Sequence, residues 1–209
     1  GFPVLYAWLH DPPQAAARDA AVDSATDGGV TLRQLIYEHC HGILGDKKLK
    51  AVIPGGSSCP IFDAETSYSV KMDYEDVASK GSMLGSGAII VLDETRSIGD
   101  VMKWTLEFYH HESCGQCSPC REGTGWMEKV LHRLDNGNGK MEDIDLLWDI
   151  QRKIEGNTIC PLGDAASWPV AAAIRHFREE FEWHVTHPKE AMERNYGLRK
   201  NIFVMPQTS

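Results

Sequence analysis

The stretch Cys114-Gly115-Gln116-Cys117-Ser118-Pro119-Cys120 contains three cysteines, each three residues after the last, and a fourth cysteine follows in Ile159-Cys160-Pro161. Thiolates at this spacing can turn three sulfurs into one concave pocket, where each binds a different iron of a cubane. The remote cysteine then supplies the fourth corner. Bacterial ferredoxins combine the same compact triplet with a Cys-Pro elsewhere in the chain. The sequence therefore predicts one [4Fe–4S] cluster with four ligands, Cys114, Cys117, Cys120 and Cys160.

Other uses of the cysteines fit this pattern less well. A structural zinc site with four cysteine ligands usually brings them as two separated pairs, not as a triplet and a single residue. A dithiol redox motif needs only two of the thiols. A disulfide framework is disfavoured in a long chain with six cysteines and no recognisable secretory segment. Cys40 and Cys59 have no partner at ligand spacing, and we expect them to behave as small apolar residues.

Composition limits the function classes further. The 209 residues include 21 Lys+Arg and 30 Asp+Glu, a net charge of −9, which argues against nucleic-acid binding. No run of 18 apolar residues occurs, so we expect no direct membrane insertion. Reduced thiolates indicate a reducing, intracellular compartment. The chain opens at Gly1 without an initiator Met, so we expect a fragment or a processed product.

Patterning predicts an α+β fold in five segments. Residues 1–27 form an irregular segment, although Val4–Leu9 could be a strand, and residues 28–66 form a small α+β module. Residues 67–95 connect this module to the rest of the chain. Their apolar run before Asp93 predicts a strand that is buried on both of its faces and belongs to a larger sheet. Residues 96–186 form a four-helix bundle, and residues 187–209 form a C-terminal tail.

Local signals place several of these elements. Thr31 is expected to cap the first helix of the small module, and Lys50–Ile53 to form a strand. Ser97, with Asp100 three residues later, resembles a capping box at the start of the first bundle helix.

The links of the bundle carry the cysteines. The second helix is expected to follow Cys120, and the fourth to begin between Asp164 and Pro169, where a proline is tolerated in the first turn. The triplet then lies on the first link and Cys160 on the third. Since first and third links of an up-down bundle lie at the same end, the four sulfurs should come together.

Other side chains near the cysteines have more ordinary explanations. Arg121 either places positive charge near the cluster or forms a salt bridge within the bundle. His110, His111 and His176 could be redox-linked bases or ligands, but solvated or core positions are favoured. Four tryptophans at helical spacing are predicted to pack in the core: Trp104, Trp126, Trp148 and Trp168.

Two long motifs resemble a known family. The stretches Glu112–Gly123 and Glu155–Ala166, the latter followed by Trp168-Pro169-Val170, closely resemble the cluster-binding part of the flavin-bearing, NADH-oxidising subunit of respiratory complex I. Ala51–Ser58 resembles the end of that subunit's soluble-ligand-binding β-grasp domain, which implies that residues 28–66 are a β-grasp module. The resemblance runs from about Val30 to about Arg178 in the same order.

The resemblance implies a role in NADH:quinone oxidoreduction. In the family the cluster accepts electrons from FMN, which NADH reduces, and passes them along an iron–sulfur chain toward quinone. The Gly-rich loop that binds FMN and NADH lies in an N-terminal half that this chain lacks, so we expect the chain alone to be inactive, with no catalytic residue of its own. Residues Phe2 to Asp27 do not resemble the family.

The resemblance also implies partners and a location. The expected partners are other peripheral-arm subunits of complex I, including a [2Fe–2S] thioredoxin-like subunit and a multi-cluster iron–sulfur subunit. The expected location is the cytoplasmic face of the bacterial inner membrane, or the matrix side in mitochondria. Two alternatives remain open: the flavin subunit of a soluble NAD-reducing hydrogenase or NAD-linked formate dehydrogenase, and a metal-stabilised assembly module without redox turnover.

Overall fold

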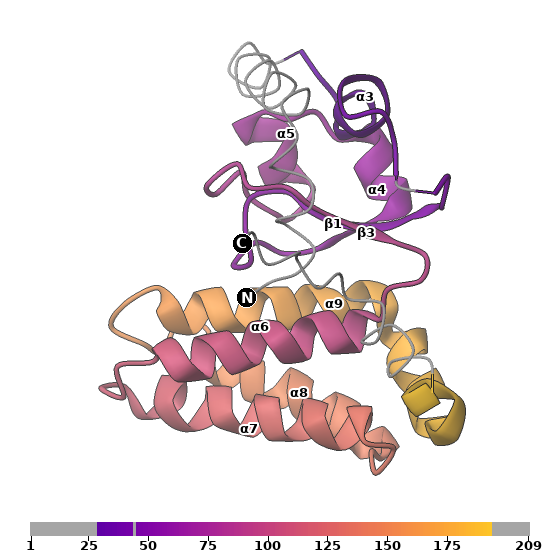
Figure 1. The fold of residues 1–209 in the computed structure, drawn as a ribbon. Helices are drawn as coiled ribbons and strands as arrows, with labels where there is room; N and C mark the ends of the chain where they lie inside the picture. The colour runs from indigo at the N-terminus through magenta and orange to yellow at the C-terminus, as the bar shows by residue number, and fades with distance from the viewer. Residues whose placement is uncertain (1–28, 44, 194–209) are drawn as a thin grey trace, which may run out of the picture.

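A three-stranded antiparallel sheet lies between a layer of short helices and a layer of four long helices (Figure 1). This computed structural model describes residues 29–43 and 45–193. The predicted strand Val4–Leu9 and the irregular segment 1–27 fall outside the described residues. The mixture of helices and a small sheet confirms the predicted α+β class.

The first part of the described chain builds the sheet and the short helices. Thr31 caps the first helix as predicted, because its hydroxyl accepts from the Gln34 amide while the Gln34 side chain accepts from the Thr31 amide. The elements in chain order are α3 (Leu32–Gln34), η1 (Leu35–His39), β1 (Leu49–Ile53), β2 (Phe62–Asp63), α4 (Ala64–Ser69), α5 (Tyr74–Ser79) and β3 (Ile90–Asp93).

The central strand, β1, has apolar side chains on both faces. Val52 belongs to the apolar cluster under the short helices, whereas Ala51 and Ile53 belong to the cluster shared with the long helices. A register shift in the pairing with β3 lies between Leu49 and Ala51, and Leu49 joins Val52 on the side of the short helices. The sheet is therefore covered on both faces, which explains why β1 is apolar almost throughout.

The apolar run before Asp93 forms β3, but its surroundings differ from the prediction of a larger sheet. In the described part of the chain β3 pairs only with β1, in a sheet of order β2-β1-β3. Ile90 and Leu92 pack toward the long helices, and Ile89 and Val91 pack toward the short ones. Because a strand between two helical layers buries both faces, it has the same continuous apolar run as a strand inside a larger sheet.

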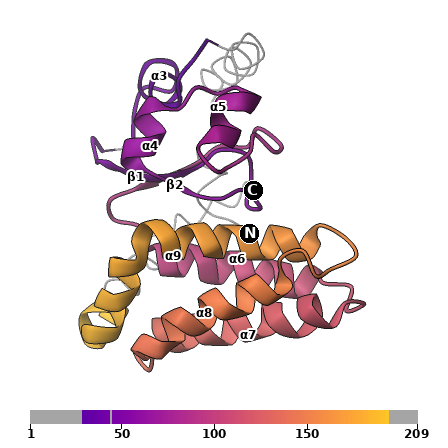
Figure 2. The ribbon, with the colours of Figure 1, turned by 180° about the vertical axis from the view of Figure 1, so that it is seen from behind.

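The second layer consists of α6 (Ile98–Glu112), α7 (Ser118–Asp135), α8 (Met141–Ile154) and α9 (Leu162–Thr186). Apolar residues of all four helices share one core with the lower face of the sheet. The links after α6 and after α8 lie at one end of this layer, and the link after α7 lies at the other (Figures 1 and 2). Within the segment predicted as a C-terminal tail, residues 188–193 are helical.

Two helix starts differ from the prediction. Helix α7 begins at Ser118, before Cys120, because Pro119 has a backbone compatible with the first turn. Helix α9 begins at Leu162 with Pro161 as its N-cap residue, so Pro169 lies inside the helix instead of in its first turn. The Ala165 amide donates to the Pro161 carbonyl at 2.8 Å, which closes the earlier first turn.

The tryptophans follow the core prediction only in part. Trp148 is partly buried and packs against the core. Trp104 and Trp126 are 47% and 53% exposed, so the prediction of core packing is wrong for these two. The Trp104 ring packs 5.1 Å from the Lys103 ammonium, and Trp126 lines a cavity between α7 and α8.

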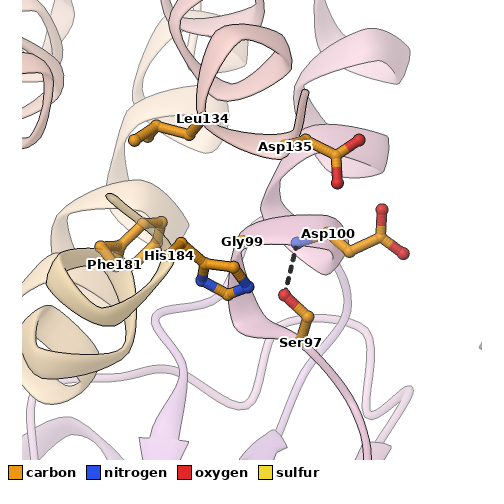
Figure 3. Close-up of a pocket in the computed structure, with 7 residues that line it drawn as sticks. All are labelled: Ser97, Gly99, Asp100, Leu134, Asp135, Phe181 and His184. Atoms are coloured by element: carbon orange, nitrogen blue, oxygen red, sulfur yellow. Dashed lines mark hydrogen bonds between the residues drawn. The ribbon is translucent and has the colours of Figure 1, made fainter. Parts of the chain in front are cut away.

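Glu180 of α9 ties the sheet to the long helices. Its Oε1 accepts from the Ile98 amide at the start of α6, at 3.0 Å, and its Oε2 pairs with Lys50 Nζ of β1 at 2.6 Å. The same end of α6 is capped by Ser97, whose Oγ accepts from the Asp100 amide, and it packs against α9 near His184 (Figure 3). The Glu180 contacts and the Ser97 cap therefore fix the orientation of the α6 N-terminus, and the helix runs from there to the cysteine loop.

An ion pair between α7 and α8 makes stability depend on pH. The hydrogen bond from Arg133 holds the pKa of Asp143 below its ordinary value, and the Lys140 amide also donates to this carboxylate. A lowered carboxyl pKa adds stability above the unfolded value of about 3.9, and this stability is lost as pH falls through the folded value. We expect Arg133→Met to cost about 1 kcal/mol at pH 7.

This prediction is checked by urea unfolding of the parent and the variant at several pH values. The difference in unfolding free energy should shrink between about pH 5 and pH 2, as Asp143 becomes protonated. A difference that stays constant over this range would show that Arg133 contributes through packing and not through its charge.

Candidate metal centre

The two cysteine-bearing links come together at one end of the long helices. The Ile159 amide, on the link between α8 and α9, lies 3.4 Å from Cys117 Sγ, on the link between α6 and α7, and donates to it. These residues are 42 positions apart in the sequence. The predicted meeting of the first and third links is therefore present in the structure.

The cysteine triplet spans the transition from loop to helix. Cys114 lies in the loop after α6 and is exposed, Cys117 is the N-cap residue of α7, and Cys120 lies in its first turn and is buried. The side chain of Cys117 makes no capping hydrogen bond. The N-terminus of a helix carries partial positive charge, which suits a negatively charged group bound beside these residues.

The Arg121 side chain, on α7, forms hydrogen bonds to the loop that precedes this helix. Its Nη1 donates to the Gly115 carbonyl at 2.7 Å, and its Nε donates to Glu122 Oε1 at 2.9 Å. Gly115 has φ +77°, a left-handed conformation that side chains other than glycine rarely adopt. Arg121 thus places positive charge beside the triplet and also forms a salt bridge with Glu122 of the same helix, so both of its predicted roles are present.

Ser113 has no distinctive signal in the sequence, yet its hydroxyl lies among the cysteines. Its Oγ is 3.3 Å from Cys120 Sγ and accepts from the Gly115 amide at 3.3 Å. A serine directly before a cysteine is too common to identify a contact, so only the structure reveals this one.

The link that carries Cys160 is held by its own set of hydrogen bonds. The Gly156 amide donates to Asp164 Oδ1 at 2.7 Å, and Trp168 Nε1 donates to Glu155 Oε1 at 2.9 Å. The Thr158 hydroxyl donates to the Cys160 carbonyl at 2.9 Å. Cys160 itself is exposed, directly before the N-cap residue of α9.

Two glycines let the links approach each other. A Cβ on Gly123 of α7 would lie 2.7 Å from the Ile154 side chain at the end of α8. A Cβ on Gly163 of α9 would lie 2.6 Å from the Thr158 side chain. Both distances are shorter than van der Waals contact, so a larger residue at position 123 would displace the Ile154 side chain or separate α7 from the end of α8, and one at position 163 would displace Thr158 or separate α9 from the link after α8.

The remaining candidate side chains lie elsewhere. Burial raises the pKa of the Cys40 and Cys59 thiols, which keeps them protonated and agrees with their predicted apolar character. His111 is exposed beside Glu112, and His176 lies 3.6 Å from Asp63 of β2. His110 contacts Glu128 of α7.

The four thiols suit an iron–sulfur cluster by their donor chemistry. Cys117 Sγ accepts a hydrogen bond from the Ile159 amide. Cys120 Sγ lies at hydrogen-bond distance from the Ser113 hydroxyl, and either group can be the donor. Hydrogen bonds to ligand sulfurs are among the interactions by which proteins adjust the potential of such clusters. The described residues therefore fit the group that the cysteine spacing predicts.

Comparison with known proteins gives consistent matches. Residues 100–184 match the family described as the NADH-ubiquinone oxidoreductase-F iron-sulfur binding region. The chain is 46% identical over 154 residues to an NADH-quinone oxidoreductase subunit of Rhodobacter capsulatus, covering 73% of this chain and 36% of the relative. It is 50% identical over 154 residues to mitochondrial NADH dehydrogenase [ubiquinone] flavoprotein 1 of Dictyostelium discoideum, covering 73% of this chain and 32% of the relative.

A solved structure resembles the fold. The H2-reduced state of an NAD+-reducing [NiFe]-hydrogenase superposes with a TM-score of 0.66 at 26% identity, over 76% of this chain and 26% of the hydrogenase chain. With respect to the two oxidoreductase relatives described above, the chain spans about a third of their length. In the described part of the chain, no helix is both long and apolar enough for a membrane span. By these matches, residues 100–184 are similar to the NADH-ubiquinone oxidoreductase-F iron-sulfur binding region.

Proposed function

We propose that Cys114, Cys117, Cys120 and Cys160 hold one [4Fe–4S] cluster and that the chain is the electron-transfer segment of an NADH:quinone oxidoreductase subunit. In this proposal electrons pass from NADH through FMN to the cluster and then along an iron–sulfur chain toward quinone. The observation that carries the proposal is the contact of the two cysteine-bearing links, through the Ile159 amide and Cys117 Sγ.

The cluster, when bound, supplies a one-electron acceptor and donor. The residues of the chain prepare its surroundings. The Ile159 amide donates toward Cys117, and the Ser113 hydroxyl lies at hydrogen-bond distance from Cys120. Hydrogen bonds donated to ligand sulfurs would lower their electron density and make reduction of a bound cluster more favourable. Cys114 and Cys160 are exposed, which leaves that side of the site open to neighbouring protein.

The finer architecture belongs to the same proposal. Residues 28–66 correspond to a β-grasp-like, soluble-ligand-binding module, and residues 96–186 to a cluster-bearing four-helix bundle. FMN and NADH are assigned to the full-length subunit, because the matched relatives are about three times as long as the matched segment. The proposed partners are other peripheral-arm subunits, including a [2Fe–2S] thioredoxin-like subunit and a multi-cluster iron–sulfur subunit. The proposed location is the cytoplasmic or matrix side of the membrane.

A second candidate is the corresponding subunit of a soluble NAD-reducing hydrogenase. The structural likeness to the NAD+-reducing [NiFe]-hydrogenase supports it. The respiratory assignment is favoured because the sequence identities to the NADH-quinone oxidoreductase and NADH dehydrogenase relatives are 46% and 50%, against 26% for the hydrogenase.

The proposal is tested in a full-length subunit that contains this chain, assembled with its partners. We expect Cys117→Ala to leave NADH:ferricyanide activity largely intact, because FMN can reduce ferricyanide, and to lower NADH:quinone activity at least 100-fold. Cys40→Ala is the matched control and should change neither rate. Undiminished quinone reduction in assembled Cys117→Ala would contradict the proposed electron route. Failure with quinone but activity with a hydrogenase partner would favour the second candidate.

A further inference from the structure

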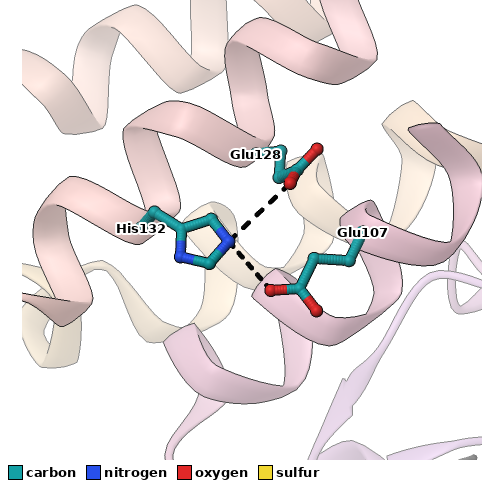
Figure 4. Close-up of side chains that lie close together, drawn as sticks. All are labelled: Glu107, Glu128 and His132. Atoms are coloured by element: carbon teal, nitrogen blue, oxygen red, sulfur yellow. Dashed lines mark ion pairs between the residues drawn. The ribbon is translucent and has the colours of Figure 1, made fainter. Parts of the chain in front are cut away.

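A group of acidic and histidine side chains lies on the outer face of α6 and α7, apart from the cysteines. Glu107 of α6 and Glu128 and His132 of α7 place one ligand atom each within 4.8 Å of one another (Figure 4). His132 Nε2 is 2.8 Å from Glu107 Oε1 and 3.7 Å from Glu128 Oε1. All three side chains are partly buried, with exposed fractions of 28%, 22% and 41% in sequence order.

The three ligand atoms lie close to the spacing around one metal ion, with one pair closer together than a bound ion requires. Zinc bonds of about 2.0–2.2 Å to nitrogen and oxygen in a tetrahedron place the ligand atoms about 3.3–3.6 Å apart. The His132–Glu128 distance of 3.7 Å is close to this spacing, whereas the His132–Glu107 distance of 2.8 Å is that of a hydrogen bond, so a bound ion would separate this pair by about 0.5 Å. One imidazole N–H can be directed fully at only one carboxylate, so Glu128 Oε1, at 3.7 Å, faces His132 Nε2 without a hydrogen bond to it.

A fourth residue holds one of the carboxylates in place. His110 Nδ1 lies 2.5 Å from Glu128 Oε2, the oxygen not facing His132. The His110 ring packs on the α7 backbone at Gly125, where a Cβ would lie 2.9 Å from Nε2. The contact thus depends on a glycine at that position. Carboxylate–histidine pairs of this kind orient the ligands in many metal sites.

The two helices contribute matched spacings. Glu107 and His110 are three residues apart on α6, and Glu128 and His132 are four residues apart on α7, so each pair lies on one helix face. The group has no signature in the sequence, because neither pair is distinctive until the two helices lie side by side. Two carboxylates within 4.8 Å also repel each other, and a cation between them would remove this repulsion.

We propose that Glu107, Glu128 and His132 form a binding site for a borderline divalent cation, Zn²⁺, with water in the fourth position. Mixed imidazole and carboxylate ligands are typical of zinc in proteins. His110 is a positioning residue that orients Glu128. The bound ion cross-links α6 and α7 behind the cysteine loop. The site uses no thiol and is independent of the proposed function.

The test uses the chain with its iron–sulfur cluster assembled, so that the thiols are occupied. Zn²⁺ binding is measured by competition with a chromophoric chelator, and the ligands are identified by X-ray absorption at the zinc edge. The parent should bind one equivalent with nitrogen and oxygen neighbours at about 2.0–2.1 Å. His132→Gln should lower the affinity at least tenfold. His110→Ala should lower it about 10-fold or more, with the same atoms bound directly to the zinc.

His111→Gln is the matched control, since His111 also contacts a glutamate, at 2.9 Å, but belongs to no group of three possible metal ligands among the residues that the structure describes. It should bind zinc like the parent. Circular dichroism checks that each variant is folded. If the cluster cannot be assembled, the zinc edge still separates the sites, because thiolate sulfur lies at about 2.3 Å. Equal zinc affinity in His132→Gln and the parent, or sulfur neighbours only, would overturn the proposal.

Discussion

Replacing Cys160 by alanine is expected to abolish the [4Fe–4S] cluster, with iron and acid-labile sulfide falling to a small fraction of the parent values. Cys160 is the only one of the four proposed ligands on the link between α8 and α9, so no neighbouring thiol in the described chain can take its place. The loss also removes the cross-link between the two links. Metal binding to a site that the unfolded chain lacks contributes to folding free energy, so the variant should also unfold at a lower temperature.

The controls for this experiment are the two cysteines that we assign no ligand role. Cys40→Ala and Cys59→Ala should retain the parent iron content, although Cys59 is fully buried and its loss costs some packing. Iron and sulfide assays with the absorbance spectrum give the readout. An empty site in folded Cys59→Ala would show that the ligand assignment is wrong.

The second large effect is expected from Lys103→Met in α6. The Lys103 side chain is 3% exposed, and its Nζ lies 2.8 Å from Asp100 Oδ1 and 2.8 Å from Asp135 Oδ2 of α7. Removing the ammonium leaves two carboxylates in a largely buried position without the positive charge between them. Breaking a buried ion pair in this way costs about 3–5 kcal/mol, which is a large part of the stability of a typical domain.

A second lysine–aspartate pair gives the matched control. Lys47 lies 3.2 Å from Asp93, but its side chain is 39% exposed, so Lys47→Met should cost at most about 1 kcal/mol. Urea unfolding of both variants measures the difference. Equal costs would mean that water reaches Lys103 far more than its burial indicates.

Local sequence signals predicted the helices well because they depend on neighbouring residues. The caps at Thr31 and Ser97 use side chains that bond amides three positions ahead, and both are present. The four long helices follow from apolar spacing, and the cysteine-bearing links meet because short links alternate between the two ends. These features need no knowledge of distant contacts.

Features that depend on contacts between different elements could not be predicted in this way. The burial of Lys103 requires Asp135 from the next helix, and the position of Glu180 requires Lys50, 130 residues earlier. The apolar run of β3 has the same pattern whether helices or further strands cover its faces. The start of α7 at Ser118 differs from the prediction because a ligand triplet has the pattern of a loop, although Pro119 suits a first turn.

The residues of the proposed zinc site could not be predicted from the sequence either. Glu107 and His132 are ordinary surface residues in sequence terms, and only the packing of α6 on α7 brings them together. Their partial burial and the histidine behind Glu128 separate them from the exposed His111–Glu112 pair.

The central claim is that four cysteines on two links hold one redox-active [4Fe–4S] cluster. Its most direct test is Mössbauer and electron paramagnetic resonance spectroscopy of the chain, assembled with ⁵⁷Fe and sulfide, before and after reduction with dithionite. We predict a diamagnetic oxidised cluster with four equivalents of iron, and a one-electron paramagnetic signal on reduction that is absent in Cys160→Ala. A chain that binds a single metal ion, or a cluster that stays silent on reduction, would contradict the account.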